Sequence, residues 1–401
     1  ALLGGSVTLD NSSNNIGTLA ASGVGSLTYV DSNALTVGTV GSVDGINTTG
    51  AVSVSTLTGD LTVAKDVTTT NTTTSAVALH AGKSTTVGTA SGGNIIVSGS
   101  PQITVGSGGR ATLYTGSVSD STGLTSFIGS GSGKFRYNAN ETTNFATGGW
   151  TNLSSGVYAV YRERPSVTMT VDGKTITYGD SLTLTGTPSG LVNGDMASYD
   201  IISPAYSSSN NIKAGSYTIA NSNLAALGYN VTSNTSGTLT VNRKDLTVSG
   251  LTSANKVYDG TTTAAVNGTA ALQPAITGDT VSLAGTAAGS FNDKNVANAT
   301  TVSFTGLSLA GADANNYNLT PHATAAHTIS RKELIVTAND DAKFVTQDDV
   351  SGYAGVRYSG FVNGETTTDA AVITGLDTIT ISRSNSVVED AGSYSNVLVP
   401  D

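Results

Sequence analysis

Two near-identical hexapeptides constrain the fold of this chain more than any other feature. The segment Arg-Lys-Asp-Leu-Thr-Val at residues 243–248 recurs as Arg-Lys-Glu-Leu-Ile-Val at residues 331–336. A short alternating run precedes each copy, so one strand ends, two cations mark a corner and the next strand begins. A recurrence distance of about 90 residues without a flexible spacer predicts that the second half of the chain is a string of β modules.

The composition points to an all-β protein. Charged residues make up only 11% of the 401 residues, and 48 glycines accompany many Ser, Thr and Asn residues. A typical globular protein has about 25% charged residues. Helix-favouring charged residues are therefore scarce, whereas β-branched residues are frequent throughout.

Composition also argues against several classes of protein. The formal net charge of −10 and the dispersed cations argue against a nucleic-acid partner. No run of apolar residues is long enough to span a membrane, so we expect no membrane insertion. The chain has no cysteine, which excludes disulfides and thiolate chemistry. The absence of cysteine is typical of proteins that are exported before disulfides can form. Random change in amino-acid composition explains the absence equally well.

The first third of the chain predicts a parallel β-helix over residues 1–161. Its apolar alternations are only three residues long and are separated by Gly, Asn, Ser and Thr; they lie at residues 35–37, 52–54, 61–63, 77–79, 95–97 and 103–105. Strands this short do not build an ordinary sandwich. They suit a right-handed parallel β-helix, in which each coil stacks on the one before and pairs every strand edge.

Aromatic residues gather at the end of this segment, between residues 111 and 161, and include Tyr114, Tyr137 and Trp150. The last coil of a stacked helix needs a cap over its open edges and apolar faces. We expect the aromatics to form this cap and to seat the first module. The alternative is a platform that contacts a sugar ring.

Three small modules follow, which we expect to be β-sandwich-like or β-grasp-like and to form a linear string. Module one spans residues 162–242, module two residues 243–330, and module three residues 331–401. Modules one and three share Val-Asn-Gly and Ala-Gly-Ser-Tyr segments, and each Asn-Gly predicts a hairpin. Residues 229–231 and 238–241 are predicted to form the last hairpin of module one. Module three stops before an equivalent pair, so we expect it to be incomplete at its C-terminus.

The module junctions carry cations. Arg243 and Lys244 begin module two, Arg331 and Lys332 begin module three, and Arg162 begins module one. We expect the three arginines to lie at equivalent corners and to make polar contacts with the neighbouring module.

Module two resembles the YDG repeat of large bacterial surface proteins. The resemblance rests on Asn-Lys-Val-Tyr-Asp-Gly-Thr-Thr at residues 255–262, Asp-Lys-Asn-Val at 293–296 and Gly-Ala-Asp-Ala-Asn-Asn-Tyr at 311–317. Modules one and three resemble bacterial MBG repeats through Ile-Thr-Tyr-Gly-Asp at residues 176–180 and the shared segments. Module three departs from this pattern, because residues 344–347 (Phe-Val-Thr-Gln) replace the Tyr-Gly-Asp of module one.

Residues 110–137 resemble the end of a filamentous-haemagglutinin-type β-helix. Together the resemblances imply a two-partner-secretion adhesin. Such a protein leaves a Gram-negative cell through a dedicated outer-membrane transporter. It acts at the cell surface or outside the cell in attachment, aggregation or biofilm cohesion. The family supplies no catalytic residues, so we expect no enzymatic activity.

Metal and cofactor sites are not indicated. The chain has three histidines, and no metal-ligand spacing joins them. The Asp pairs at residues 340–341 and 348–349 could offer oxygen ligands to Ca²⁺, but no calcium-loop pattern accompanies them, so we expect solvated loops and no cofactor.

Two functions remain open from the sequence. The first is a rigid surface stalk in attachment, aggregation or biofilm cohesion, with exopolysaccharide or a neighbouring cell surface as partner. The second is a carbohydrate-binding module that holds matrix exopolysaccharide through exposed aromatics.

Overall fold

Short strands separated by turns dominate the structure. The computed structural model describes residues 1–345, 347–369, 375–387 and 390–401, so Thr346 of the divergent segment in module three lies outside it. In these residues the helical segments are brief: α1 (Leu124–Ile128), α2 (Leu224–Leu227), η1 (Ala314–Asn316) and η2 (Leu376–Thr378). The all-β prediction is confirmed. No helix in the described residues has the length and apolarity to cross a bilayer.

The chain divides into two compact units. The first contains Ala1–Ile176, Asp180–Pro204 and Gly215–Val241. The second contains Asn242–Asp401 together with two short segments that belong in sequence to module one, Thr177–Gly179 and Ala205–Ala214.

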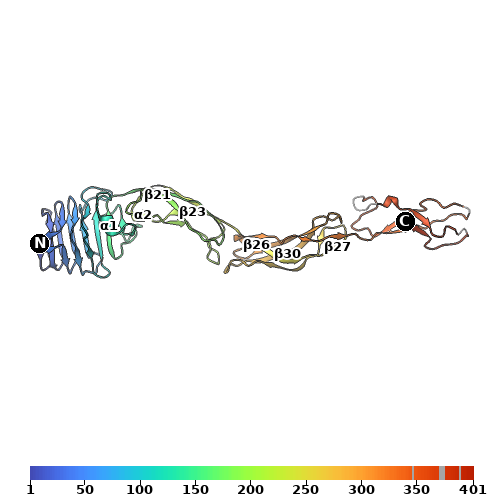
Figure 1. The fold of residues 1–401 in the computed structure, drawn as a ribbon, viewed down its shortest axis with the longest axis horizontal. Coiled ribbons are helices and arrows are strands. Elements are labelled where there is room, and N and C mark those ends of the chain that lie inside the picture. The colour runs from blue at the N-terminus through green and yellow to red at the C-terminus, as the bar shows by residue number, and fades with distance from the viewer. Residues whose placement is uncertain (346, 370–374, 388–389) are drawn as a thin grey trace. The chain divides into compact units, whose positions relative to one another are not determined.

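Residues 1–161 build three parallel sheets, drawn mainly in blue in Figure 1. The first sheet runs, in spatial order, β1 (Leu2–Leu3), β4 (Ala21–Val24), β9 (Ile46–Thr48), β12 (Val67–Thr69), β15 (Ile103–Thr104). The second runs β17 (Phe135–Arg136), β18 (Gly156–Tyr161), β16 (Arg110–Thr115), β13 (Val77–His80), β10 (Val52–Thr56), β5 (Leu27–Asp31), β2 (Val7–Leu9). The third runs β14 (Ile95–Val97), β11 (Leu61–Val63), β6 (Leu35–Val37), β3 (Thr18–Leu19). A small antiparallel pair, β7 (Thr39–Val40) and β8 (Val43–Asp44), lies between them in sequence.

Apart from β7 and β8, strands β1 to β16 visit the three sheets in rotation. Strands β9, β10 and β11 belong to the first, second and third sheet, and β12, β13 and β14 repeat that order. Each strand pairs in parallel with the strand one circuit earlier, because the chain returns to every sheet in the same direction. The six short alternations recognised in the sequence all coincide with these strands, except that Val105 lies just after β15.

The core of this region is made of stacked columns of inward side chains. Val52 of β10 pairs with Leu27 of β5 and with Val77 of β13, and all three are buried. Ser53 points to the other side of the strand and is half-buried. Burial of such columns stabilises the stack at about 25 cal/mol per Å² of apolar surface.

Module one contains two sheets. One is β21 (Gly186–Ser189), β19 (Ser166–Val171), β24 (Asn230–Thr235); the other is β20 (Lys174–Thr177), β25 (Gly237–Asn242), β23 (Gly215–Asn221), β22 (Tyr199–Ile201). Alternating side chains of β19 and β25, among them Met169 and Leu239, supply buried apolar residues. The apolar residues of the alternating sequence therefore face the core, as expected for strands with one buried face.

Two of the three hairpin predictions are wrong. Asn193-Gly194 forms a tight turn, but β21 and β22 on either side lie in different sheets. Asn363-Gly364 also forms a turn, but residues 370–374, which would supply the returning strand, lie outside the described residues, so this hairpin stays a prediction. Strands β24 and β25 do not pair, because β24 joins β19 in parallel and β25 joins β23. The alternation of apolar and polar residues shows which face of a strand is buried. It does not show which strand pairs with it, because that depends on strands far away in the sequence.

Module two contains three sheets around one core. They are β29 (Asn267–Leu272), β26 (Lys244–Thr252), β32 (Tyr317–Thr320); β27 (Lys256–Val257), β34 (Ile329–Ser330); and β28 (Thr263–Ala264), β30 (Ser282–Phe291), β31 (Thr301–Ala310), β33 (Ala325–Ala326). The core includes the buried side chains of Phe291, Val302 and Phe304. Val362 of module three packs against this core.

The described part of module three contains two small antiparallel sheets. They are β35 (Ile335–Ala338) with β36 (Val356–Ser359), and β37 (Ile381–Arg383) with β38 (Leu398–Pro400).

Candidate functional site

A buried polar cluster of the first unit is centred on Tyr137. This residue follows directly after β17, and its side chain is 0% exposed. Its ring packs on the rings of Tyr161 and Tyr229, with centroid distances of 5.5 Å and 4.6 Å. Tyr137 belongs to the aromatic segment before module one, whereas Tyr229 belongs to module one. The cluster therefore joins these two parts of the first unit.

A single carboxylate oxygen receives two tyrosine hydroxyls in this cluster. Tyr137 donates to Oδ2 of Asp195 at 2.6 Å, and Tyr229 donates to the same oxygen at 2.9 Å. Nδ2 of Asn193 donates to the Tyr137 hydroxyl at 3.0 Å. All four side chains are buried, so each polar group has its partner inside the protein rather than in water.

Burial controls the protonation of the cluster. It raises the pKa of both tyrosines, and the negative charge of Asp195 raises these pKa values further. Burial also raises the pKa of Asp195, while the hydrogen bonds from Tyr137 and Tyr229 oppose that rise. The tyrosines therefore remain protonated hydrogen-bond donors to the Asp195 carboxylate.

A tight turn presents this carboxylate. In Val192-Asn193-Gly194-Asp195 the two central residues have φ values of 53° and 72°. The amide of Asp195 donates to the carbonyl of Val192 at 3.0 Å. Asn and Gly tolerate positive φ better than other residues, so the local sequence explains the turn.

The other two predicted ligand-contact aromatics lie in a separate cluster. Tyr114 is half-buried and stacks on His80 with a centroid distance of 4.8 Å. Trp150 is half-buried and meets Phe145 edge-on at 5.5 Å. Both pack against the same small buried group, which includes Phe145 and Val160. The structure thus packs Tyr114 and Trp150 on one group, whereas the ring of Tyr137 packs on Tyr161 and Tyr229.

The predicted equivalence of the junction arginines is wrong. Arg162 is 1% exposed, and its guanidinium donates to the carbonyls of Ala81, Ser91 and Gly93 at 2.6, 3.2 and 2.8 Å. These partners lie in the stack of residues 1–161 and not in module one. Arg162 therefore ties its own corner to the preceding strands.

Arg243 and Arg331, with neighbouring Lys332, are exposed, and Lys244 is half-buried. All four lie next to strand ends at the start of modules two and three. They share the local sequence of a junction but not the environment of Arg162, because they are not covered by a stack of earlier strands.

His80 is a buried imidazole with a predictable effect on stability. Burial lowers its pKa to about 4, with Glu141 and Lys83 as the nearby charges. An unfolded histidine titrates near pH 6.5. As the pH falls from 6.5 to about 4, the unfolded chain gains a proton that the folded chain resists, so His80 should cost about 3 kcal/mol of stability over this window.

This effect can be measured as the difference between pH profiles of unfolding free energy for the wild type and for His80→Gln. We expect the wild type to lose more stability than the variant between pH 6.5 and 4. Parallel profiles would contradict the buried, neutral state of His80.

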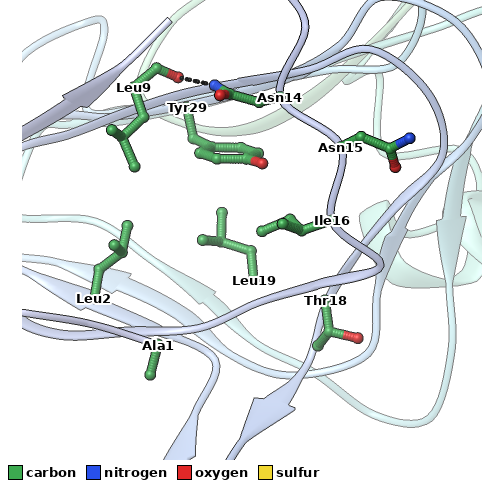
Figure 2. A pocket seen from close by; sticks show the side chains of 9 residues that line it. All are labelled: Ala1, Leu2, Leu9, Asn14, Asn15, Ile16, Thr18, Leu19 and Tyr29. Carbon is green, nitrogen blue, oxygen red and sulfur yellow. Dashed lines mark hydrogen bonds between the residues drawn. The ribbon is translucent and has the colours of Figure 1, made fainter. Parts of the chain in front are cut away.

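A cavity of about 260 Å³ lies among the first strands, and Figure 2 shows its lining. Leu2, Leu9, Ile16 and Leu19 provide aliphatic walls, and the Tyr29 ring closes one side. The amide of Asn14 donates to the carbonyl of Leu9 at 3.1 Å. The lining is mainly apolar, and it adds no cluster of acids or bases.

One of the four aspartates considered for calcium, Asp349, contacts two cations. The carboxylate of Asp349 pairs with Lys343 at 2.8 Å and with Arg383 at 3.1 Å. Hydrogen bonds from these two cations lower its pKa to about 2. Within the described residues, no three His, Asp or Glu side chains gather closely enough to hold a metal ion.

Sequence reasoning missed Asp195 and Tyr229 as members of the Tyr137 cluster. Part of the cluster could be seen in the sequence, because Val-Asn-Gly-Asp at residues 192–195 is recognisable as a tight turn. Nothing local connects that turn to a tyrosine 58 residues earlier.

Two family models match parts of the chain. Residues 167–240 match the MBG domain (YGX type), and residues 242–326 match the YDG domain. The comparison with curated proteins gave no significant match. The recognition of MBG-like and YDG-like sequence is confirmed for these stretches, and their tandem order is consistent with a surface or adhesin-like repeat protein.

Proposed function

We propose that this chain is a non-enzymatic segment of a secreted bacterial adhesin of the filamentous-haemagglutinin type. In this proposal residues 1–161 are the end of a right-handed parallel β-helix, and small sandwich-like or grasp-like modules continue it as a rigid stalk. The main support is the order of parts: rotating parallel strands come first, then sequences that match the MBG and YDG domains.

The proposed setting is the surface of a Gram-negative cell. A dedicated outer-membrane transporter exports the chain, which then serves attachment, aggregation or cohesion of a biofilm matrix. Structural locks such as the Tyr137 cluster suit a stalk, because buried charge-assisted hydrogen bonds fix one part against the next.

Surface labelling tests the proposal. Antibodies raised against the purified chain should label intact cells of the source bacterium, and the label should disappear when the transporter gene is deleted. An in-frame deletion of residues 162–330 should reduce attachment or biofilm mass. Label that appears only after the cells are permeabilised would contradict the proposal.

A carbohydrate-binding role is the competing proposal. Its support is that Tyr114 and Trp150 are both only half-buried and surround one small cluster. Purified matrix exopolysaccharide should then bind the wild type and bind Trp150→Ala at least tenfold more weakly, with little change in melting temperature. No measurable binding by the wild type would refute this role.

A further inference from the structure

A second carboxylate in the chain repeats the geometry of Asp195. In the second unit, Tyr178 donates to Oδ2 of Asp279 at 2.6 Å, and Tyr317 donates to the same oxygen at 2.6 Å. The two rings meet edge-on with a centroid distance of 5.3 Å. Tyr178 belongs in sequence to module one, whereas Asp279 and Tyr317 belong to module two.

The turns that carry the two aspartates are equivalent in detail. The amide of Asp279 donates to the carbonyl of Ile276 at 3.0 Å, as that of Asp195 does to Val192. The amide of Val192 donates to the Tyr229 hydroxyl at 3.1 Å, and the amide of Ile276 donates to the Tyr317 hydroxyl at 3.0 Å.

The tyrosines inside the modules are also equivalent. Tyr229 begins a Tyr-Asn-Val-Thr segment and Tyr317 begins Tyr-Asn-Leu-Thr. Tyr229 immediately precedes β24 and Tyr317 begins β32, and each strand pairs in parallel with the first strand of its module: β24 with β19, and β32 with β26. Modules one and two differ in sequence family, yet they build the same acceptor.

A third carboxylate, in module three, also accepts a hydrogen bond from a tyrosine of the preceding module. The hydroxyl of Tyr258 in module two donates to Glu365 of module three. Glu365 closes its Val-Asn-Gly-Glu turn through a bond from its amide to the carbonyl of Val362 at 3.0 Å. Nδ2 of Asn363 donates to the carbonyl of Gly260 at 3.2 Å.

The donor tyrosines occupy equivalent backbone positions. Tyr137, Tyr178 and Tyr258 each follow directly after a short strand: β17, β20 and β27. The amides of Tyr178 and Tyr258 donate to the carbonyls of Asn242 and Ser330 at 2.8 and 2.9 Å. These two carbonyls immediately precede Arg243 and Arg331, so the backbone of each tyrosine docks at the corner that the hexapeptides mark.

Glycines that follow two of these tyrosines within two residues permit close approach. Gly179 has a φ of 88°, and a Cβ there would lie 2.3 Å from Cδ1 of Ile276 in the Asp279 turn. Gly260 has a φ of 75°, and a Cβ there would lie 2.7 Å from Cβ of Asn363. A side chain at either position would be strained by the positive φ and would force its neighbour in the acceptor turn to shift.

We propose that these contacts are copies of one coupling device, the tyrosine–carboxylate joint. Its donor is the tyrosine after a short strand of one part of the chain. Its acceptor is the acidic residue that ends a [Val/Ile]-x-Gly-[Asp/Glu] turn in the module that follows. The joint assigns a role to the Tyr-Gly-Asp and Tyr-Asp-Gly segments: they recognise the next module. This role does not depend on what the chain attaches to.

The chemistry explains why tyrosine and a carboxylate are used. A hydroxyl that donates to an ionised carboxylate makes a short hydrogen bond, roughly twice as strong as a neutral one. Burial acts to raise the pKa of Asp279, but donors that include Ser209, Tyr178 and Tyr317 outweigh it and lower the pKa. Asp279 is therefore ionised at neutral pH, and the joint is fully formed.

Module three differs at the donor position. An ungapped alignment of residues 172–180 with residues 341–349 places Gln347 where module one has Tyr178. Module three therefore carries the acceptor Glu365 but no tyrosine at the aligned donor position. It can receive a joint from module two but cannot form one of this type from Gln347.

Paired spin labels test the joint in the intact chain, which has no native cysteine to remove. One label pair, at Thr170→Cys and Ser308→Cys, spans the Tyr178 joint, and another, at Ser308→Cys and Ser359→Cys, spans the Tyr258 joint. All three sites are exposed. We expect Tyr178→Phe to broaden the first distance distribution at least twofold and to leave the second unchanged. Tyr258→Phe should do the reverse.

Matched variants separate coupling from general damage. Tyr206→Phe, an exposed tyrosine in the second unit, should change neither distribution. Asp279→Asn should act like Tyr178→Phe, and the double variant should broaden the distribution no further than either single one. The inference is overturned if Tyr178→Phe leaves the first distribution unchanged, or if it broadens both distributions equally.

Discussion

Replacing Arg162 by alanine is expected to lower the free energy of unfolding of the first unit by about 4 kcal/mol. The guanidinium is buried and donates to three backbone carbonyls, those of Ala81, Ser91 and Gly93. Without it these carbonyls lose a buried donor, and the space of a large side chain is left unfilled. Burial of the guanidinium itself carries a cost, visible in its lowered pKa, so the loss is smaller than the sum of three hydrogen bonds.

The chain offers two matched controls for this experiment. Arg243 and Arg331 begin the modules with the same local sequence but are exposed, so alanine at either position should change stability by no more than about 0.5 kcal/mol. Denaturant unfolding of the three variants measures the difference. Equal losses of stability at all three positions would mean that the three arginines have equivalent environments, as the sequence suggested.

Replacing Val52 by aspartate should be comparably damaging. Val52 is 1% exposed and lies between Leu27 and Val77 in a column of buried apolar side chains. A carboxylate there has no polar partner, so it must be buried unpaired or must disrupt the strand. We expect a loss of about 4 kcal/mol in the free energy of unfolding.

Ser53→Asp is the control for that change, because Ser53 is adjacent in sequence and points to the opposite side of the strand. Its effect should stay below about 1 kcal/mol. Thermal unfolding of the two variants gives the comparison. Equal losses of stability would mean that Val52 does not face the core.

The strands of the first 161 residues could be predicted because their signal is local. Val52, Ser53 and Val54 alternate between apolar and polar within three residues. A short alternating run followed by turn residues is compatible with few structures other than a short strand. The turn at Asn193-Gly194 was predictable for the same reason, since positive φ is a property of those two residues.

The joints could not be predicted, because their donors and acceptors are far apart in sequence. Tyr178 and Asp279 are separated by 101 residues, and Tyr258 and Glu365 by 107. No periodic pattern links such pairs. The arginines show the converse: Arg162 and Arg243 look alike locally, yet only Arg162 has earlier strands packed around it.

The position of the joint also affects how such a chain can change in length. In module two, the acceptor Asp279 faces a tyrosine from the part before it, and the donor Tyr258 faces an acid in the part after it. A gene duplication that copies the whole module therefore copies one donor and one acceptor together. Every boundary then keeps a matched pair, so repeat number can grow or shrink in whole modules without a compensating mutation elsewhere.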